Sequence, residues 1–333
     1  MTRVAVAGAG WAGEVHVAAL ERVAGAKLVQ IVSRTTESAE RTAATVGVPA
    51  GTYAELSSKA EVVVVATPPT HHLEMALAAL DGGRSLLVEK PLCATLAEAD
   101  ELVAAVEQRD VVAGYAENLL FAPAIIAAIA HRGTGPLRHL SVRMGQPAPD
   151  WGHFLEPLTA GGVLFDLGSH GVALALALAG SDAVSVSAEL RSDREDGADD
   201  DATLRIRFAD GLVGIVEASW RAERPVWDLQ AAAEDRVTRV ELLPQVAVEL
   251  DGEDATPEPT NPLADFGYVD QIDGVLGVRE RRGGRVCPLG FGRLVLDVLC
   301  AAYASAGAGG SEIELPFAGP RDRTPLQLWR DPG

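Results

Sequence analysis

Three side chains stand out as candidates for chemistry: Lys90, Asp166 and His170. Lys90 lies between Glu89 and Pro91, directly after a predicted strand, where a surface charge is the ordinary alternative. An ammonium group at the end of a strand can orient a substrate hydroxyl or carbonyl, stabilise an oxyanion and share in proton transfer. We therefore predict that Lys90 is catalytic.

Asp166 and His170 lie in a predicted helix that begins near Gly161-Gly162 and ends at Ala179. Because they are four residues apart, their side chains share one helical face. A carboxylate and an imidazole together can hold a polyol and exchange its proton. The same spacing also fits an Asp that stabilises the helix dipole and a histidine that packs in the core, so both interpretations stand.

A glycine-rich turn near the N-terminus has the spacing of a dinucleotide-binding motif. Gly8, Gly10 and Gly13 follow a predicted strand and open a predicted helix. Gly8 permits the tight turn, Gly10 lets the backbone approach a pyrophosphate, and Gly13 lets the helix pack on the strand. The start of the helix, at Trp11 and Ala12, supplies unpaired N–H groups for the phosphates. We predict that these five residues bind a nicotinamide dinucleotide.

The end of the second predicted strand carries Ser33-Arg34-Thr35 in place of the acidic residue usual in NAD sites. A serine and an arginine can bind a 2′-phosphate, and Arg34 can also stack on adenine. NADP(H) is therefore favoured and NAD(H) is the alternative, in which Glu37 reaches the ribose and Arg34 is a surface residue.

Other distinctive segments follow the third, fourth and fifth predicted strands. Thr67-Pro68-Pro69, Glu89-Lys90-Pro91 and the stretch from Tyr115 to Asn118 all come at strand ends. Because ligands bind outside the carboxyl ends of parallel strands, we predict that Thr67, Pro68, Glu89, Lys90 and Asn118 contact the cofactor. No metal site is expected, since His71 and His72 are adjacent on a helix and face different directions.

Hydrophobic periodicity predicts the elements that must position these residues. In the first third, short β-branched runs alternate with helical patterns, which is typical of a doubly wound parallel sheet. Strands are predicted at 3–7, 27–32, 61–66, 85–88 and 111–114, and helices at 12–23, 37–46, 71–80 and 96–108. Further on, strands predicted at 137–144, 184–190, 202–208, 212–219 and 237–242 follow one another, which indicates an open, mainly antiparallel sheet.

These patterns predict an α/β protein of two domains: a dinucleotide-binding Rossmann domain at 1–118 and a substrate-binding and oligomerisation domain at 119–333. A late helix at 290–305 is expected to be able to pack back on the first domain. The acidic segment 193–201 and the Pro-rich segment 251–262 are predicted to be solvated hairpin loops, with a substrate lid as the alternative.

Composition excludes several classes of partner. The net charge of −19 disfavours nucleic acid and anionic membrane surfaces. The cysteines, Cys93, Cys287 and Cys300, form no CxxC pair, which fits core thiols in a reducing compartment. The N-terminus shows no signal-peptide pattern, and the apolar stretch at 171–180 is too short to span a bilayer, so we expect a cytoplasmic protein.

Taken together, the motifs resemble those of the Gfo/Idh/MocA family, named for glucose-fructose oxidoreductase and inositol dehydrogenase. The matches are Gly8-x-Gly10-x-x-Gly13, Thr67-Pro68-Pro69-x-x-His72, Glu89-Lys90-Pro91 and Gly161-Gly162-x-x-x-Asp166-x-Gly168-x-His170. The resemblance implies that Lys90 contacts substrate and nicotinamide ribose, that Asp166 orients the substrate, and that His170 is the acid/base. It also adds His72 to the cofactor site, a cis bond at Lys90-Pro91, and a homodimer or homotetramer formed through the second sheet.

The chain departs from the family pattern in two places. Asn118-Leu119-Leu120-Phe121 lacks the usual arginine, and Val172-Ala173-Leu174 lacks an aspartate that often follows the histidine. Without these residues, a substrate that bears a phosphate or carboxylate has one binding partner fewer. We therefore expect an uncharged sugar, a cyclitol or a less polar ketone or imine. Asn118, together with Trp151, His153 and Glu156, is predicted to contact the substrate, and aromatic packing is the alternative for Trp151.

We therefore predict an NAD(P)-dependent dehydrogenase or reductase that transfers a hydride between NADPH and a secondary alcohol or ketone of a sugar, cyclitol or related molecule. One alternative keeps fold and cofactor but reduces an imine or cleaves a glycoside through redox-assisted elimination. Another is a non-catalytic dinucleotide sensor, which has no need of Lys90, Asp166 and His170 together.

Overall fold

The computed structural model describes residues 1–150 and 161–331. By their internal contacts these residues form two compact units. Unit 1 comprises Met1–Ala122 and Thr260–Arg293, and unit 2 comprises Pro123–Pro259 and Leu294–Gly333.

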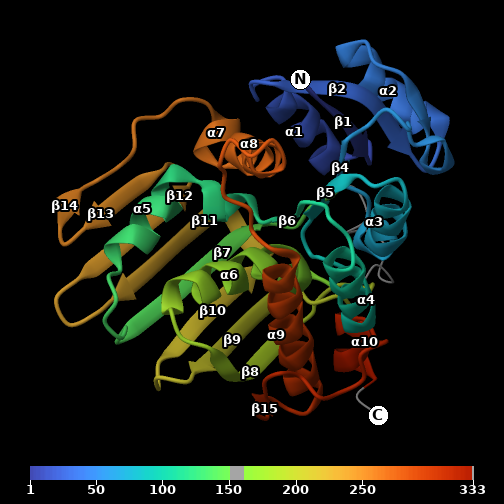
Figure 1. Cartoon of the computed structure of the whole chain (residues 1–333). Helices are drawn as coiled ribbons and strands as arrows, with labels where there is room; N and C mark the ends of the chain where they lie inside the picture. The colour runs from blue at the N-terminus through green and yellow to red at the C-terminus, as the bar shows by residue number, and fades with distance from the viewer. Residues whose placement is uncertain (151–160, 332–333) are drawn as a thin grey trace. The chain divides into compact units, whose positions relative to one another are not determined.

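Unit 1 is built on a six-stranded parallel sheet of order β3-β2-β1-β4-β5-β6 (Figure 1). The short apolar runs seen in the sequence are its strands, and β4 is wholly buried, as expected of a strand covered on both faces. The order reverses between β1 and β4, which is where ligands bind in such sheets. The strands are β1 (Thr2–Ala7), β2 (Ala26–Ser33), β3 (Ala50–Thr52), β4 (Val62–Val65), β5 (Ser85–Glu89) and β6 (Ala113–Ala116).

Side-chain caps mark the starts of two helices of unit 1, α2 and α4. Thr35 caps α2 by accepting a hydrogen bond from the Ser38 amide, and Thr95 and Glu98 form a capping box on α4. The helices are α1 (Trp11–Leu20), α2 (Thr36–Val46), α3 (His72–Asp81), α4 (Leu96–Glu107), α7 (Pro262–Asp265) and α8 (Tyr268–Arg279). Short 3-10 turns lie at Tyr53–Glu55, Pro69–His71 and Asn118–Phe121.

The predicted second domain of 119–333 differs from unit 2, because residues 260–293 group with unit 1. The physical reason is burial: Ile272, Val275 and Leu276 of α8 belong to the same apolar core as β1 and β4. The unit boundary falls within α9 (Leu289–Gly307), after Arg293. The packing expected for the late helix at 290–305 stays a prediction.

Unit 2 contains a nine-stranded sheet of order β14-β13-β12-β11-β7-β10-β9-β8-β15. Its pairings are antiparallel except for β10 with β7, which is parallel, so the sheet is mixed but mainly antiparallel as predicted. The strands are β7 (His139–Pro147), β8 (Ala183–Arg191), β9 (Asp201–Phe208), β10 (Val213–Ser219), β11 (Arg221–Ala232), β12 (Val237–Leu243), β13 (Ala247–Leu250), β14 (Glu253–Asp254) and β15 (Ile313–Glu314).

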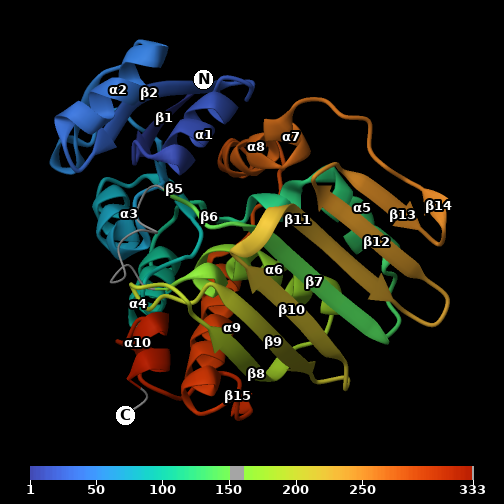
Figure 2. The same ribbon diagram turned by 180° about the vertical axis from the view of Figure 1, so that it is seen from behind.

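One face of this sheet is packed and the other is open. Leu140, Val142 and Met144 of β7 are buried on the packed face, against which α6 (Val163–Ala179) lies. A Cβ at Gly171 would lie 2.7 Å from Val216 of β10, so glycine allows α6 to approach the strands closely. Figure 2 shows the opposite face of β7, β10, β11 and β12 without a covering helix. The remaining helices of unit 2 are α5 (Pro123–His131) and α10 (Pro325–Arg330).

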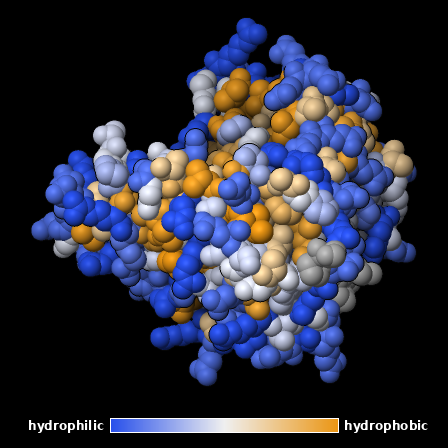
Figure 3. Space-filling model, turned by 90° about the horizontal axis from the view of Figure 1, so that it is seen from below, coloured by the Kyte–Doolittle hydropathy of each residue, from blue (hydrophilic) through white to orange (hydrophobic). Residues whose placement is uncertain are grey.

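The surface and the cysteines agree with a protein that buries most of its apolar side chains. Figure 3 shows hydrophilic residues over most of the face seen from below, with hydrophobic residues gathered towards its middle.

Helix α9 is long and apolar enough to cross a membrane by length and composition alone. However, 67% of its most apolar stretch is buried inside the protein, as in a core helix. All three cysteines are buried and unbridged, and burial raises the pKa of Cys287 to about 12.

Candidate active site

The turn between β1 and α1 holds three glycines that serve different purposes. Gly8 has a φ of +122°, and a Cβ there would lie 2.0 Å from the Ala66 carbonyl oxygen. A Cβ at Gly13 would lie 2.1 Å from the Gly8 oxygen, so both glycines are required by the fold itself. A Cβ at Gly10 would meet nothing within 4 Å. The fold does not require a glycine at position 10, but a ligand that approached this backbone would.

The start of α1 fits the phosphates of a dinucleotide. Gly10 is the N-cap residue of α1 and has no side chain to cap the helix. The Glu14 amide donates a hydrogen bond to the backbone oxygen of Gly10. The preceding helix amides point outward with the positive end of the helix dipole, which favours an anion. Trp11, which is 54% exposed, and the half-buried Ala12 flank this position.

At the end of β2, Ser33 is buried whereas Arg34 and Thr35 are exposed. Tyr53 lies beside them: burial raises the pKa of its phenol, and a hydrogen bond with Ser33 and the charge of Arg34 partly offset that rise. The Tyr53 ring also faces His71, with ring centroids 6.3 Å apart. This end of the sheet therefore combines two basic side chains with an aromatic ring.

His72, the first residue of α3, contacts two backbone carbonyl groups. It is wholly buried, with Nε2 2.8 Å from the Thr67 oxygen and Nδ1 3.1 Å from the Leu92 oxygen. Burial lowers the pKa of His72, against the opposing effect of these two carbonyls. Both ring nitrogens lie near backbone oxygens, so His72 links the Thr67-Pro68 turn to the segment after Lys90, and its contact with the cofactor stays a prediction.

Lys90 follows β5 on a backbone held by buried groups. The Lys90 amide donates to Glu89 Oε2 at 2.9 Å, and Glu89 Oε1 lies 2.7 Å from Nε2 of the fully buried His16. Burial works against ionisation of Glu89, but the His16 hydrogen bond and the charge of Lys90 outweigh it and lower the pKa of Glu89. The Lys90–Pro91 peptide is cis, and Lys90 itself is half-buried. His16 and Glu89 thus fix the point from which the lysine side chain projects.

Asn118, predicted to contact cofactor and substrate, is buried after β6. Its side-chain amide nitrogen donates a hydrogen bond to the backbone oxygen of Phe266 at 2.8 Å. Gly267 follows with a φ of +79°, where a Cβ would lie 2.1 Å from the Asn118 oxygen. Asn118 thus links the end of β6 to the segment before α8, a structural role in addition to its predicted contacts with cofactor and substrate.

In unit 2, Asp166 and His170 lie on α6 as predicted, at 7% and 5% exposure. The His170 ring lies beside Trp227 of β11, with centroids 6.0 Å apart and planes inclined by 38°. An indole beside an imidazole lowers the local polarity and restricts the orientation of the ring. Trp151, His153 and Glu156, also predicted for this site, lie outside the described residues.

Several neighbours of the predicted residues were missed from the sequence. His16 lies three residues after Gly13, and this spacing was the available signal, but its partner Glu89 is 73 residues away. Tyr53 and Trp227 carried no local signal because they approach Ser33 and His170 only through sheet packing. Within residues 1–150 and 161–331, no group of three or more His, Cys, Asp and Glu side chains is placed to hold a metal.

Comparison with known families gives two separate matches, one over the parallel sheet and one over most of the second sheet. Residues 2–117 match the model of an oxidoreductase family with an NAD-binding Rossmann fold. Residues 124–241 match the model of the GFO/IDH/MocA C-terminal domain. The first match contains Gly8, Gly10, Gly13 and Lys90, and the second contains Asp166 and His170.

Individual relatives are more distant. Levoglucosan dehydrogenase of Pseudarthrobacter phenanthrenivorans is 29% identical over 194 residues, which are 48% of this chain and 50% of that protein. The scyllo-inositol 2-dehydrogenase (NAD(+)) of Bacillus subtilis is 29% identical over 231 residues, 65% of this chain and 67% of that one. The chain thus spans about half the length of the first of these relatives and about two thirds of the second.

A solved structure matches over nearly the whole chain. GenD2 from gentamicin A biosynthesis, in complex with NAD, is 28% identical, with a TM-score of 0.85 over 94% of this chain and 96% of that one. The likeness therefore includes both units.

Proposed function

The chain belongs to the GFO/IDH/MocA oxidoreductase family, and from that membership we propose that it transfers a hydride between a nicotinamide cofactor and a secondary alcohol or ketone of a sugar, cyclitol or related small molecule. The observation that carries this proposal is Lys90, held at the carboxyl end of β5 by Glu89 and His16. The relatives named for levoglucosan and scyllo-inositol support a polyhydroxylated substrate. Turnover of such alcohols, followed at the nicotinamide absorbance, tests it.

The bound nicotinamide would supply the hydride acceptor or donor. The turn at Gly8, Gly10 and Gly13 and the start of α1 would hold its pyrophosphate. In the proposed reaction the Lys90 ammonium hydrogen-bonds the substrate oxygen and stabilises its negative charge. Asp166 orients a neighbouring hydroxyl, and His170 takes the alcohol proton in oxidation or returns it in reduction.

We further propose NADP(H) as the preferred cofactor. The scyllo-inositol relative is named for NAD(+) and the GenD2 structure contains NAD. In this chain, however, β2 ends at Ser33 followed by the exposed Arg34, with no carboxylate at either position. A guanidinium there favours a 2′-phosphate over a free 2′-hydroxyl.

Replacing Arg34 by alanine is expected to weaken NADPH binding about tenfold or more, because a charge-assisted hydrogen bond to phosphate is lost. NADH binding should change little. Fluorescence titration of both cofactors measures the two dissociation constants, and Arg41→Ala, which removes an exposed arginine from the following helix α2, is the control. Tighter binding of NADH than of NADPH by the unmodified protein would reject the assignment.

We also propose that the chain forms a homodimer or homotetramer through the open face of the unit 2 sheet. This face is half polar: Arg143 pairs with Asp228 across β7 and β11, and Ile215 of β10 lies opposite Ser141 and Arg205. Charged side chains on an open sheet face can pair with those of a second copy related by a twofold axis.

Light scattering on the purified protein should give a mass of two or four chains, and Ile215→Glu should shift it towards one, because a new charge would be buried in the interface. Val278→Glu, at an exposed position in unit 1, is the matched control. A single-chain mass for the unmodified protein at micromolar concentration would dismiss the proposal.

A further inference from the structure

The backbone amides in the first turn of α6 need hydrogen-bond acceptors from elsewhere in the chain. Its N-cap residue is Gly162, which has no side chain to cap the helix. Residues Val163, Leu164 and Phe165 are buried, so their amides cannot be satisfied by bulk water. Buried helix amides without a partner are costly.

Asp199, from the segment between β8 and β9, provides those partners. Its Oδ1 accepts from the Gly162 amide at 2.9 Å and its Oδ2 from the Leu164 amide at 2.7 Å. Its own carbonyl oxygen accepts from the Val163 amide at 2.8 Å. One residue, 35 or more positions away, therefore caps three successive amides.

Tyr303 of α9 also binds the Asp199 carboxylate. Its hydroxyl donates to Asp199 Oδ1 at 2.6 Å. Burial and the neighbouring carboxylate raise the pKa of the Tyr303 phenol well above its ordinary value, so the hydroxyl remains a donor. Burial also raises the pKa of Asp199, and the bonds from Tyr303 and the α6 amides oppose that rise.

The same contacts explain the glycine pair that opens α6. A Cβ at Gly162 would lie 2.0 Å from the Asp199 carbonyl oxygen. A Cβ at Gly161 would lie 2.5 Å from the Phe165 Cβ and 2.7 Å from the Tyr303 hydroxyl oxygen. Both glycines make room for Asp199 and Tyr303.

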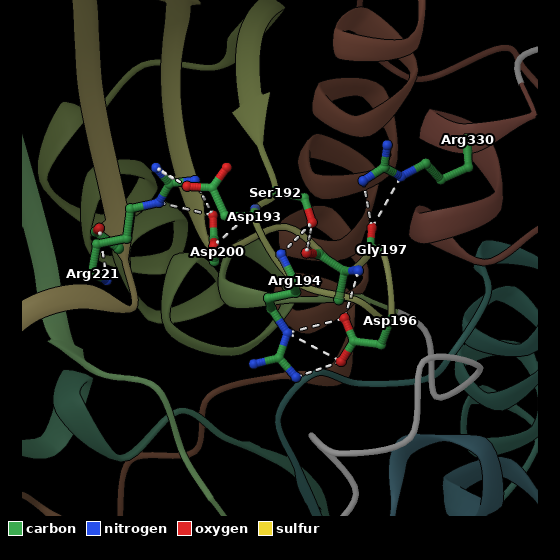
Figure 4. Close-up of polar contacts among 10 residues, drawn as sticks. Ser192, Asp193, Arg194, Asp196, Gly197, Asp200, Arg221 and Arg330 are labelled. Carbon is green, nitrogen blue, oxygen red and sulfur yellow. Dashed lines mark hydrogen bonds and ion pairs between the residues drawn. The ribbon is translucent and has the colours of Figure 1, made fainter.

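The segment that carries Asp199 is anchored, which corrects the prediction of a solvated loop at 193–201. Asp199 is fully buried and Asp200 is 8% exposed. Figure 4 shows Arg221 bound to Asp200 and Asp193, and Arg330 of α10 donating to the Gly197 oxygen. Within the segment Arg194 pairs with Asp196 and lies over the Trp220 ring, 5.3 Å from its centroid. The anchors hold the position from which Asp199 reaches α6.

We propose that Asp199 is a positioning residue, which together with Tyr303 fixes the first turn of α6 and thereby the orientation of Asp166 and His170. This inference rests on the proposed function of those two residues. Asp166 lies within one turn of the capped amides and His170 one turn further along the helix. Fraying of the first turn would move the carboxylate first and the imidazole next.

The test compares Asp199→Asn, Tyr303→Phe and the double variant with the unmodified protein. Asparagine keeps the size of the side chain but presents an N–H group to one of the α6 amides. Amide hydrogen exchange at Gly162 and Leu164 should quicken about tenfold or more in Asp199→Asn, because a buried donor loses its acceptor. Exchange in the last turns of α6 should stay the same. Glu195→Gln changes an exposed side chain in the same segment and is the control. It should alter neither amide exchange in α6 nor turnover.

Turnover separates positioning from general stability. We expect kcat of Asp199→Asn to fall about tenfold or more while its cofactor dissociation constant stays within about twofold. Tyr303→Phe should show a smaller loss in the same direction, and it provides the comparison if Asp199→Asn does not fold. The double variant should lose less than the product of the two single losses, because the residues act as one unit.

Unchanged exchange at the start of α6 in folded Asp199→Asn would overturn the proposal, and so would faster exchange with unchanged kcat. A parallel loss of cofactor binding would also overturn it, since it would indicate general disruption. If the unmodified protein turns over no alcohol, the proposed function fails, whereas the exchange measurement still decides whether Asp199 fixes α6.

Discussion

Replacing Lys90 by methionine is expected to lower kcat about a thousandfold, within the range seen when a group that shares in proton transfer is removed. Methionine keeps the length and the apolar stem of the side chain but removes the ammonium that would bind the substrate oxygen. The two hydrogen bonds of the clamp, from the Lys90 backbone amide to Glu89 and between Glu89 and His16, do not use the lysine side chain, so the fold should be preserved. Steady-state kinetics and a cofactor titration on the same preparation give both quantities.

The matched control is Lys59→Met, which removes an exposed lysine from unit 1. It should leave kcat and cofactor binding unchanged. Full turnover in Lys90→Met would refute the catalytic role, and a loss of cofactor binding equal to the loss of turnover would reassign Lys90 to the cofactor alone.

Replacing Gly10 by alanine is expected to weaken cofactor binding about tenfold or more while leaving the melting temperature of the free protein nearly unchanged. Its φ of −88° suits any residue, and the added Cβ meets no protein atom within 4 Å. The methyl group would instead occupy space where the pyrophosphate approaches the backbone. Calorimetric titration and thermal unfolding of the same samples separate the two effects.

Gly8→Ala and Gly13→Ala provide the contrast. Each would place a Cβ about 2 Å from a backbone oxygen, so each should destabilise the free protein by about 2 kcal/mol or more. Equal destabilisation in all three variants, or normal cofactor binding by Gly10→Ala, would show that Gly10 has no special relation to a ligand.

Unit 1 was the more predictable part of the fold because its signals are local. Strands such as Val62–Val65 are short buried runs, and the helices α2 and α4 have cap residues of their own, Thr35 and Thr95. The strand β3 was missed because it has only three residues, Ala50–Thr52.

Other elements were missed because their local sequence argues against them. The strand β11 contains Pro225 and several charges, and it stays in the sheet because its pairing with β7 is interrupted between Arg221 and Val226, where the proline lies. The helix α8 contains Gly274 and Gly277, which lower helix propensity. Both let the chain at 283–285 pass close by, since a Cβ at either would lie within about 2.2 Å of a backbone oxygen there.

The candidate site likewise contains residues that short motifs predict and residues that only the folded structure reveals. Gly8, Gly10, Gly13, Lys90, Asp166 and His170 could be proposed from spacing because each belongs to a short motif. The supports could not, because Glu89 binds His16 across 73 positions and Tyr303 binds Asp199 across 104. His72 and Asn118 were assigned to the cofactor from their motifs, and only their contacts with backbone oxygens reveal a positioning role for each.

Transfer of deuterium from a labelled substrate to the cofactor tests hydride transfer most directly. Cyclitols and sugars deuterated at the carbinol carbon would be incubated with the full chain and NADP+ or NAD+, and the reduced cofactor analysed by mass spectrometry and NMR. We expect one deuterium per reduced nicotinamide, placed at the ring carbon that accepts the hydride, and none with Lys90→Met. Binding of cofactor without reduction by any of these alcohols, or reduction without the label, would contradict it.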